Sequence, residues 1–242
     1  MEKILSIKLL APICLSMAMT AAAARADTIV DMQTTFGDID IELFDTTAPL
    51  TVKNFLSYVE NGAYNGSFFH RDVPGFVLQG GGYTWDSVNE RPAAIPQQAP
   101  VVNEFGASNV TGSIAMAKVG GDPNSATNQW FFNLADNSSN LDKQNGGFTV
   151  FGQVINNGMQ VVNEIASQSV FDLGGDFTDL PVINYTQTEY NQNISPASNN
   201  LIFVNDIIIL PLPGGASLFA AGLLCWHGRR LFKARAGSTW AE

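Results

Sequence analysis

The sequence predicts a mainly β protein whose short strands close into a barrel, with two helices beside it. Short runs rich in β-branched and aromatic residues follow one another, and clusters of Gly, Asn, Asp and Pro separate them. Only two stretches have the spacing of an amphipathic helix. The 45% of hydrophobic and 14% of charged residues suit a packed core rather than a disordered chain. Closure is favoured because it removes exposed sheet edges.

The first strands and the first helix have clear patterns. Two strands are predicted around Phe36-Gly37, over Thr28–Thr35 and Asp38–Phe44, and the second alternates polar and apolar residues as a half-buried strand does. Thr46 and Thr47 are candidate caps for the helix that follows, and Asn61-Gly62 ends it. Its apolar positions recur at i, i+3, i+4 and i+7, namely Val52, Phe55, Leu56 and Val59.

The rest of the body is a series of short strands and one more helix. The helix is predicted over Met159–Ala166, where every third residue is apolar. A loop-rich stretch, Ser167–Asn200, precedes a final strand over Leu201–Leu210, and its polar part Tyr185–Asn200 is expected to be mobile. The intervening strands are predicted over Ser67–His70, Phe76–Gln79, Gly112–Ala117, Gln129–Leu134 and Thr149–Val154.

Charge and cysteine placement exclude several function classes. The net charge is −10, and residues 27–213 hold five basic against twenty acidic residues, a net −15. A body this acidic argues against nucleic-acid binding, which depends on neutralising phosphates. The two cysteines, Cys14 and Cys225, lie outside this body. The body therefore has no disulfide, thiolate metal site or thiol nucleophile.

The first 26 residues have the pattern of a secretory signal peptide. Lys3 and Lys8 precede an apolar stretch, and Ala24-Arg25-Ala26 supplies a small-x-small cleavage site. A membrane anchor is the alternative, but Pro12 interrupts the apolar stretch, which is also short for a span. We therefore expect cleavage after Ala26 and an exported protein.

The last residues, 211–242, have the pattern of an anchor. Pro-rich residues lead into an apolar segment, Gly214–Trp226, and a cluster of Arg and Lys follows. This order resembles the C-terminal sorting tails that exosortases handle, which implies a periplasmic or envelope location and inner-membrane association in a bacterium. An amphipathic or packed tail is the alternative. The predicted organisation is thus a signal peptide (1–26), one domain (27–210) and a sorting tail (211–242).

Three motifs follow one another in the body. The run FFHRDVPGFVLQGGG occupies residues 68–82, MAKVGGDPNSATNQWFFNLADNS occupies 116–138, and LDKQNGGFTVFGQV occupies 141–154. In this order they resemble the signature of the cyclophilin-type peptidyl-prolyl cis-trans isomerases, over roughly residues 28–210. The resemblance implies an eight-stranded antiparallel barrel closed by two helices. It also implies a monomer that acts on proline-containing polypeptides and needs no cofactor or metal.

Arg71 matches the main catalytic group of that family. The X-Pro bond rotates slowly because C–N resonance imposes a barrier of about 18–20 kcal/mol. Twisting breaks the resonance and leaves a lone pair on the prolyl nitrogen, which a fixed cation stabilises. A guanidinium never deprotonates and has a rigid fork of donors, so Arg71 suits this role. The alternative is a surface ion pair with the neighbouring Asp72, which would contribute little.

The resemblance also assigns a substrate-binding surface. In the family the apolar members hold the proline ring, the glutamines contact the substrate, and the segment at 117–118 pairs with it through backbone groups. Three of the residues differ from the commonest ones, since Val77, Lys118 and Phe148 stand where many members have Met, Asn and His. The matching residues are Phe76, Val77, Gln79, Ala117, Lys118, Gln129, Phe131, Leu141 and Phe148.

His70 and the glycines beside it invite other interpretations. His70 is the only histidine of the body, but no Ser or Cys has the spacing of a catalytic triad with it, so we expect it to support the site from behind. Gly80-Gly81-Gly82 lacks the Lys-Ser/Thr step of a phosphate loop. Two alternatives to the isomerase stay open, namely a non-catalytic module that binds proline segments and an anchored structural protein. Convergence of Arg71, Phe76, Gln79 and Phe131 on one pocket would favour the isomerase.

Overall fold

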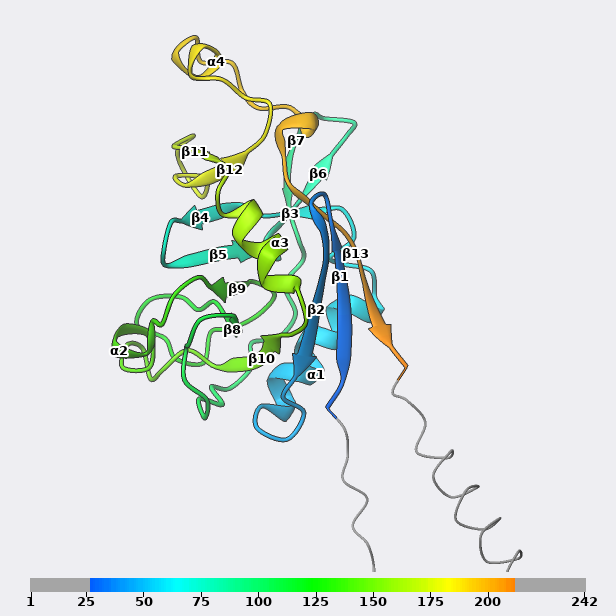
Figure 1. Ribbon diagram of the computed structural model, residues 1–242, viewed down its shortest axis with the longest axis vertical. Coiled ribbons are helices and arrows are strands. Elements are labelled where there is room, and N and C mark those ends of the chain that lie inside the picture. Colours follow the sequence, from blue (N-terminus) through cyan, green and yellow to red (C-terminus); the bar gives the residue numbers. More distant parts are fainter. Residues whose placement is uncertain (1–26, 212–242) are drawn as a thin grey trace, which may run out of the picture.

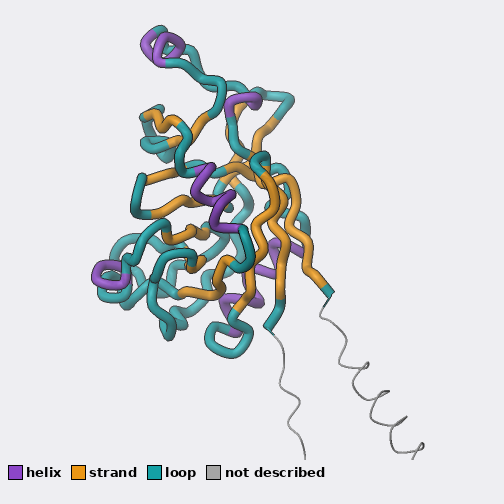
Figure 2. Tube along the Cα trace, in the orientation of Figure 1, coloured by secondary structure: helices purple, strands orange, loops and turns teal. Residues whose placement is uncertain are grey.

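A computed structural model describes residues 27–211 (Figure 1). The predicted signal peptide and nearly all of the predicted sorting tail lie outside the described residues. Within 27–211, no helix is both long and apolar enough to cross a bilayer. Strands and loops dominate this part of the chain, and its helices are few and short (Figure 2).

The described chain contains thirteen strands and four α-helices. The helices are α1 (Pro49–Glu60), α2 (Ser138–Leu141), α3 (Gly158–Ile165) and α4 (Gln187–Asn191). The strands are β1 (Ile29–Thr34), β2 (Gly37–Leu43), β3 (Ser67–Phe68), β4 (Arg71–Val73), β5 (Val77–Gly80), β6 (Tyr83–Asp86), β7 (Arg91–Ala94), β8 (Ser113–Met116), β9 (Trp130–Asn133), β10 (Val150–Val154), β11 (Ser169–Phe171), β12 (Leu180–Val182) and β13 (Phe203–Leu210).

Eleven of these strands form one antiparallel sheet in the order β4-β5-β9-β8-β10-β2-β1-β13-β3-β6-β7, and β11 and β12 form a separate pair. The prediction of a closed eight-stranded barrel is therefore not confirmed, because the sheet has more strands and its bonded order is open. One reason is that the chain splits a single extended stretch into β3 and β4 at Phe69 and His70. There Phe69 N–H donates to Ile202 O and His70 N–H donates to Gln79 O, so the chain passes directly from the β13 side of the sheet to its β5 end.

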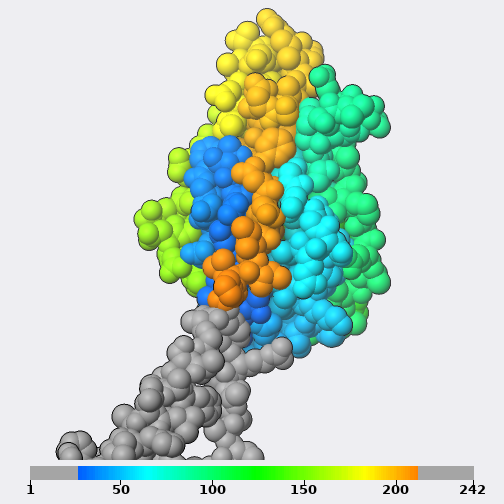
Figure 3. All heavy atoms as spheres, turned by 90° about the vertical axis from the view of Figure 1, so that its right-hand side faces the viewer, coloured from blue at the N-terminus to red at the C-terminus, as the bar shows by residue number. Residues whose placement is uncertain are grey.

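The predicted first strands and both predicted helices are confirmed. In the β1–β2 pair, Val30 lies opposite Ile41 and Met32 opposite Ile39, and all four are buried. Alternation along each strand therefore supplies one face of the core. β1 also pairs with β13, and the two strands lie side by side in Figure 3.

The predicted cap of the first helix is wrong. Ala48 holds the N-cap position without a side-chain hydrogen bond, and neither Thr46 nor Thr47 caps the helix. Instead the carboxylate of Glu104 accepts the backbone N–H groups of Leu50 and Thr51, at 3.1 and 2.7 Å. A carboxylate far away in the sequence thus satisfies the free donors at the start of α1.

Two hairpins and two short helices, α2 and α4, were not predicted. The β6–β7 hairpin extends the sheet at its end, and the β11–β12 pair follows α3. The polar stretch predicted to be mobile contains α4, which begins with a capping box between Thr186 and Glu189. Residues 169–201 and the β6–β7 hairpin lie at the end of the molecule away from the grey termini (Figure 1).

Candidate active site

The strand register brings residues of the first two sequence motifs into one row. Arg71 of β4 lies opposite Gln79 of β5, Gln79 opposite Phe131 of β9, and Phe131 opposite Ala115 of β8. Directly opposed residues share a face of a sheet, so these side chains lie on the same face. The neighbouring row, with Leu78, Phe132 and Ile114, faces the buried core instead. Arg71, Gln79 and Phe131 therefore share one face, whereas Phe76 lies in the turn between β4 and β5 and packs on the apolar cluster around Phe131.

The triple glycine that begins at the last residue of β5 allows close packing behind the row. A Cβ on Gly80 would lie 2.7 Å from the Trp130 ring, and one on Gly81 would lie 2.6 Å from Trp130 Nε1. A Cβ on Gly82 would meet His70 and Gln129 at 3.0 and 3.1 Å. The glycines are therefore needed for packing, because any side chain there would push Trp130, His70 or Gln129 aside.

The polar half of the site has two fixed contacts. Gln79 Nε2 donates to Gln129 Oε1 at 2.7 Å. Arg71 Nε donates to Asp179 Oδ2 at 3.3 Å, and the side chains of this ion pair are 36% and 38% exposed. Asp179 is held in place by its own backbone, since its carbonyl accepts the N–H of Asp72 at 2.7 Å. Arg71 thus has an acidic partner, but that partner is Asp179 and not the neighbouring Asp72.

Two hollows lie on either side of the Gln79–Gln129 pair. One, of about 240 Å³, is lined by His70, Arg71, Tyr83, Asp176 and both glutamines, among others. The other, of about 160 Å³, is lined by Ala117, Lys118 and both glutamines, among others. Arg71 therefore faces open space large enough to admit part of a polypeptide.

The apolar half of the site is a cluster of its own. Val77, Ala115, Phe131, Leu141 and Val150 are buried together, and Phe76, Ala117 and Phe148 pack against them. Phe131 and Leu141 are only 4% and 5% exposed, whereas Phe76 and Phe148 are half-buried. The rings of Phe131 and Phe148 meet edge to face at 5.8 Å. Apolar contact with a ligand therefore falls mainly on Phe76 and Phe148, with Phe131 and Leu141 beneath.

Lys118 holds the rim of the apolar cluster. Its ammonium donates to the carbonyls of Asn145 and Gly147 at 2.8 and 2.7 Å and lies 4.8 Å from the centre of the Phe148 ring. Burial lowers the pKa of Lys118 from its usual range. The neighbouring Ala117 N–H donates to Gln129 O, so this donor is already used within the protein. The Lys118 side chain therefore ties down the loop that carries Phe148.

His70 and Asp72 are buried behind the row. Burial lowers the pKa of His70 to about 4, and its ring meets Tyr83 edge-on at 5.2 Å. His70 is thus neutral at pH 7 and buried, and its role in supporting the site stays a prediction. In the part of the chain that the structure describes, the carboxylate oxygens of Asp72 have no hydrogen-bond partner. Burial, together with the charge of Asp179, raises the pKa of Asp72 to about 7. Among residues 27–211, no three His, Cys, Asp or Glu side chains are grouped as metal ligands.

Three residues beside Arg71 were not predicted. Asp179 pairs with Arg71, and Asp176 accepts a hydrogen bond from the Tyr83 hydroxyl. Both aspartates come from the β11–β12 loop, about a hundred positions after Arg71 and Tyr83. The run LGGDFTDLP at 173–181 signals a turn, but nothing in it indicates which face of the sheet the turn covers.

The family model and the similar proteins that match this chain all carry the same enzyme name. Residues 29–187 match the family described as cyclophilin type peptidyl-prolyl cis-trans isomerase/CLD. A peptidyl-prolyl cis-trans isomerase of Acinetobacter baylyi is 45% identical over 150 residues, which are 61% of this chain and 76% of that protein. Peptidyl-prolyl cis-trans isomerase A of Dickeya dadantii is 42% identical over 158 residues, 64% of this chain and 79% of that protein. Peptidyl-prolyl cis-trans isomerase B of Escherichia coli is 41% identical over 146 residues, 57% of this chain and 83% of that protein.

A solved structure has a similar fold. The crystal structure of a cyclophilin-type peptidyl-prolyl cis-trans isomerase from Cryptosporidium parvum matches with a TM-score of 0.57 and 22% sequence identity. The match covers 77% of this chain and 99% of that one. A second crystal structure of the same protein, determined in the presence of the dipeptide Ala-Pro, matches with a TM-score of 0.56.

Proposed function

Because this chain belongs to the cyclophilin-type peptidyl-prolyl cis-trans isomerases, we propose that its Arg71 speeds X-Pro rotation by stabilising the twisted amide. The chain is an enzyme of this class, and cyclophilins act on proline-containing peptides. The observation that supports the role of Arg71 is the row Arg71–Gln79–Phe131, which sets a fixed cation beside an apolar cluster.

The proposed mechanism needs only an electrostatic contact. In the planar amide the prolyl nitrogen shares its lone pair with the carbonyl, and rotation through 90° localises that pair on nitrogen. A guanidinium donor aimed at this nitrogen stabilises the twisted form more than either planar form, which is the condition for catalysis. Asp179 engages Arg71 through Nε, so the terminal amino groups of the guanidinium are left to reach the substrate.

The neighbouring residues position the substrate. Phe76 and Phe148 offer exposed ring surface for the proline, and Phe131 and Leu141 form the base of the same cluster. Gln79 is oriented by its hydrogen bond to Gln129, so its remaining amide atoms are directed rather than free to rotate. The proposed subsite therefore holds the prolyl ring on one side and the peptide group on the other.

We also propose that the enzyme works outside the cytoplasm, on exported or envelope proteins, and is held at the inner membrane by its tail. The support comes from the sequence alone, namely the signal-peptide pattern of residues 1–26 and the Pro-led apolar and basic tail at 211–242. Fractionation of cells that express the full chain tests this. Recovery of the protein in the cytoplasmic fraction with an intact N-terminus would contradict it.

Replacement of Arg71 tests the proposed mechanism. The cis-to-trans conversion of a short X-Pro peptide is followed with the wild-type protein and the Arg71→Ala variant. Loss of the only cation in the row should lower kcat/KM by about 100-fold or more, as removal of a transition-state donor does. Arg71→Lys should recover only part of the wild-type kcat/KM, because the point charge of an ammonium replaces the planar guanidinium with its fork of donors. Equal rates for wild type and Arg71→Ala would reject the proposed role of Arg71.

A further inference from the structure

A second cavity lies beside the active site, at the end of the molecule away from the termini. Its volume is about 620 Å³, within the range of roughly 300–1,000 Å³ that is usual for ligand sites. One wall comes from the β6–β7 hairpin and the other from residues 172–201, the two parts of the chain that project together in Figures 1 and 3. None of the residues in the Arg71–Gln79–Phe131 row lines it.

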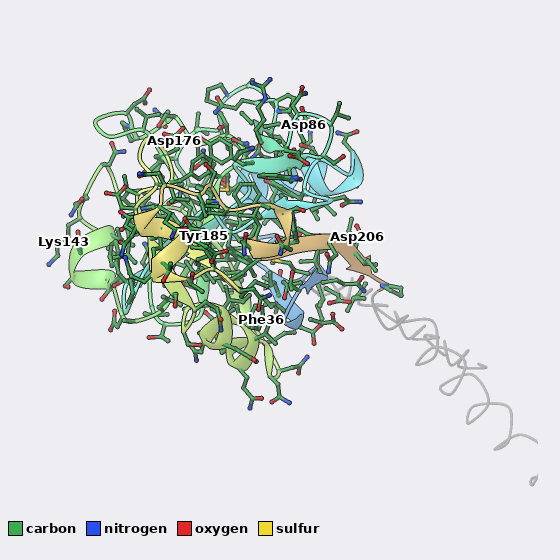
Figure 4. All side chains as sticks on the ribbon, turned by 90° about the horizontal axis from the view of Figure 1, so that it is seen from above. Phe36, Asp86, Lys143, Asp176, Tyr185 and Asp206 are labelled. Carbon is green, nitrogen blue, oxygen red and sulfur yellow. The ribbon has the colours of Figure 1, made fainter. Side chains whose placement is uncertain are left out.

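The walls of this cavity are aromatic and packed. Its lining includes Trp85, Phe177, Tyr185 and Tyr190. The rings of Tyr185 and Tyr190 each lie 5.1 Å from the ring of Phe171, and the Tyr185 hydroxyl donates to Ile194 O. Tyr185 is therefore fixed, whereas Trp85 and Tyr190 are half-buried and keep ring surface open to a ligand. Figure 4, which looks onto this end, shows Tyr185 near its centre.

The cavity favours a positively charged group. Glu90 and Asp172 line it and are exposed, against the one cation Arg91. None of these three forms an ion pair with another described residue. The described chain around them has five basic and twenty acidic residues. Aromatic faces next to carboxylates attract Lys and Arg side chains through cation–π and charge interactions.

The β11–β12 loop joins the cavity to the active site. Asp172 and Phe177 line the cavity, Asp176 and Thr178 line the hollow beside Arg71, and Asp179 pairs with Arg71. Residues of this one eight-residue loop therefore line both the cavity and the hollow beside Arg71. A single extended polypeptide that crosses this loop would reach both.

On the basis of the proposed function, we infer that this cavity binds a second segment of the polypeptide substrate while its X-Pro bond lies at Arg71. The segment is extended and carries a Lys or Arg beside an apolar or aromatic residue. Its side chains would contact the Trp85 and Tyr190 rings and the carboxylates of Glu90 and Asp172. The cavity thereby gives the enzyme a preference for long basic chains over short peptides.

Two variants and two substrates test this inference. Trp85→Ala removes an aromatic wall, and Glu90→Lys reverses a charge on an exposed residue. With a proline-limited refolding reaction of a long Lys- and Arg-rich chain, each variant should raise KM about fivefold with kcat unchanged. With a short X-Pro peptide both should match wild type within twofold. Equal effects on the two substrates, or no effect on either, would overturn the inference.

Direct binding separates this inference from the mechanism at Arg71. A proline-free peptide with alternating Lys and aromatic residues is titrated into the Arg71→Ala variant by calorimetry. It should bind there, and binding should be lost in the Arg71→Ala, Trp85→Ala double variant. The matched control is a peptide with Glu in place of Lys, which should not bind. Equal binding of the Glu peptide, or occupation of the cavity by a second copy of the chain, would overturn the inference even if Arg71 is catalytic.

Discussion

Arg71 Nε and Asp179 Oδ2 lie 3.3 Å apart, although the two residues are separated by 108 positions in the sequence. Both side chains are more than a third exposed, so the pair contributes little to stability, about 0–1 kcal/mol. The ion pair matters because it orients the guanidinium of Arg71. One donor of the guanidinium is fixed on a carboxylate whose backbone is bound to β4, and the orientation of the other donors follows.

Asp179→Asn should therefore lower kcat/KM without unfolding the protein. An amide binds the guanidinium more weakly, so Arg71 should sample more orientations and catalysis should fall roughly fivefold. Asp179→Glu keeps the charge and should recover much of the rate. The check is kcat and KM on a short X-Pro peptide beside a urea unfolding curve. A loss of stability that matches the loss of activity would indicate a merely structural role.

Phe148→Ala should weaken substrate binding. The half-buried ring supplies apolar surface over Phe131, and its removal should raise KM about tenfold and lower stability by about 2 kcal/mol. Phe36→Ala is the matched control, because Phe36 is also half-buried and packs on the main core. In Figure 4 it lies on the far side from Asp176. If Phe36→Ala raised KM as much, the assignment of Phe148 to the proline subsite would be wrong.

Asp72→Asn should stabilise the protein, and more so as the pH rises. Burial raises the pKa of Asp72 to about 7, from an ordinary 3.8 in the unfolded chain. Between pH 3.8 and about 7 the folded state holds a proton that the unfolded state has lost, so the wild type loses stability as the pH rises through this range, and the loss levels off above about 7. The advantage of Asp72→Asn should grow by about 2 kcal/mol between pH 5 and pH 8.

Chemical denaturation at the two pH values measures this difference. Glu60→Gln, which neutralises an exposed carboxylate at the end of α1, serves as the control and should show no such trend. A pH-independent effect of Asp72→Asn would show that Asp72 is ionised in the folded protein throughout this range.

Local sequence patterns were sufficient to predict the strands and helices whose apolar residues recur at a regular spacing. The alternation in β1 and β2 and the spacing of Val52, Phe55 and Val59 in α1 depend only on neighbours in sequence. Strand β7 has no such local signal, because its Pro92 argues against a strand. It is tolerated there because β7 is the last strand of the sheet.

The active site was predictable to the extent that its residues lie in contiguous motifs. Arg71, Gln79 and Phe131 share a face because they lie directly opposite one another on the neighbouring strands β4, β5 and β9. Asp176 and Asp179 were not predictable, because only the folded path of the β11–β12 loop brings them to β4. The Glu104 cap of α1 was not predictable for the same reason, because it is a long-range contact with no local signal in the sequence.

Ile29 lies directly opposite Leu210 in the β1–β13 pair, so the described domain begins and ends on neighbouring strands. Four strands of the sheet lie between β1 and β5, and both ends leave the molecule away from α4 (Figure 1). A linker, affinity handle or solid support joined to either end would therefore leave the catalytic face and the neighbouring cavity turned toward the solvent. The domain is suited to immobilisation, and both of its ends could be attached to one surface without stretching the fold.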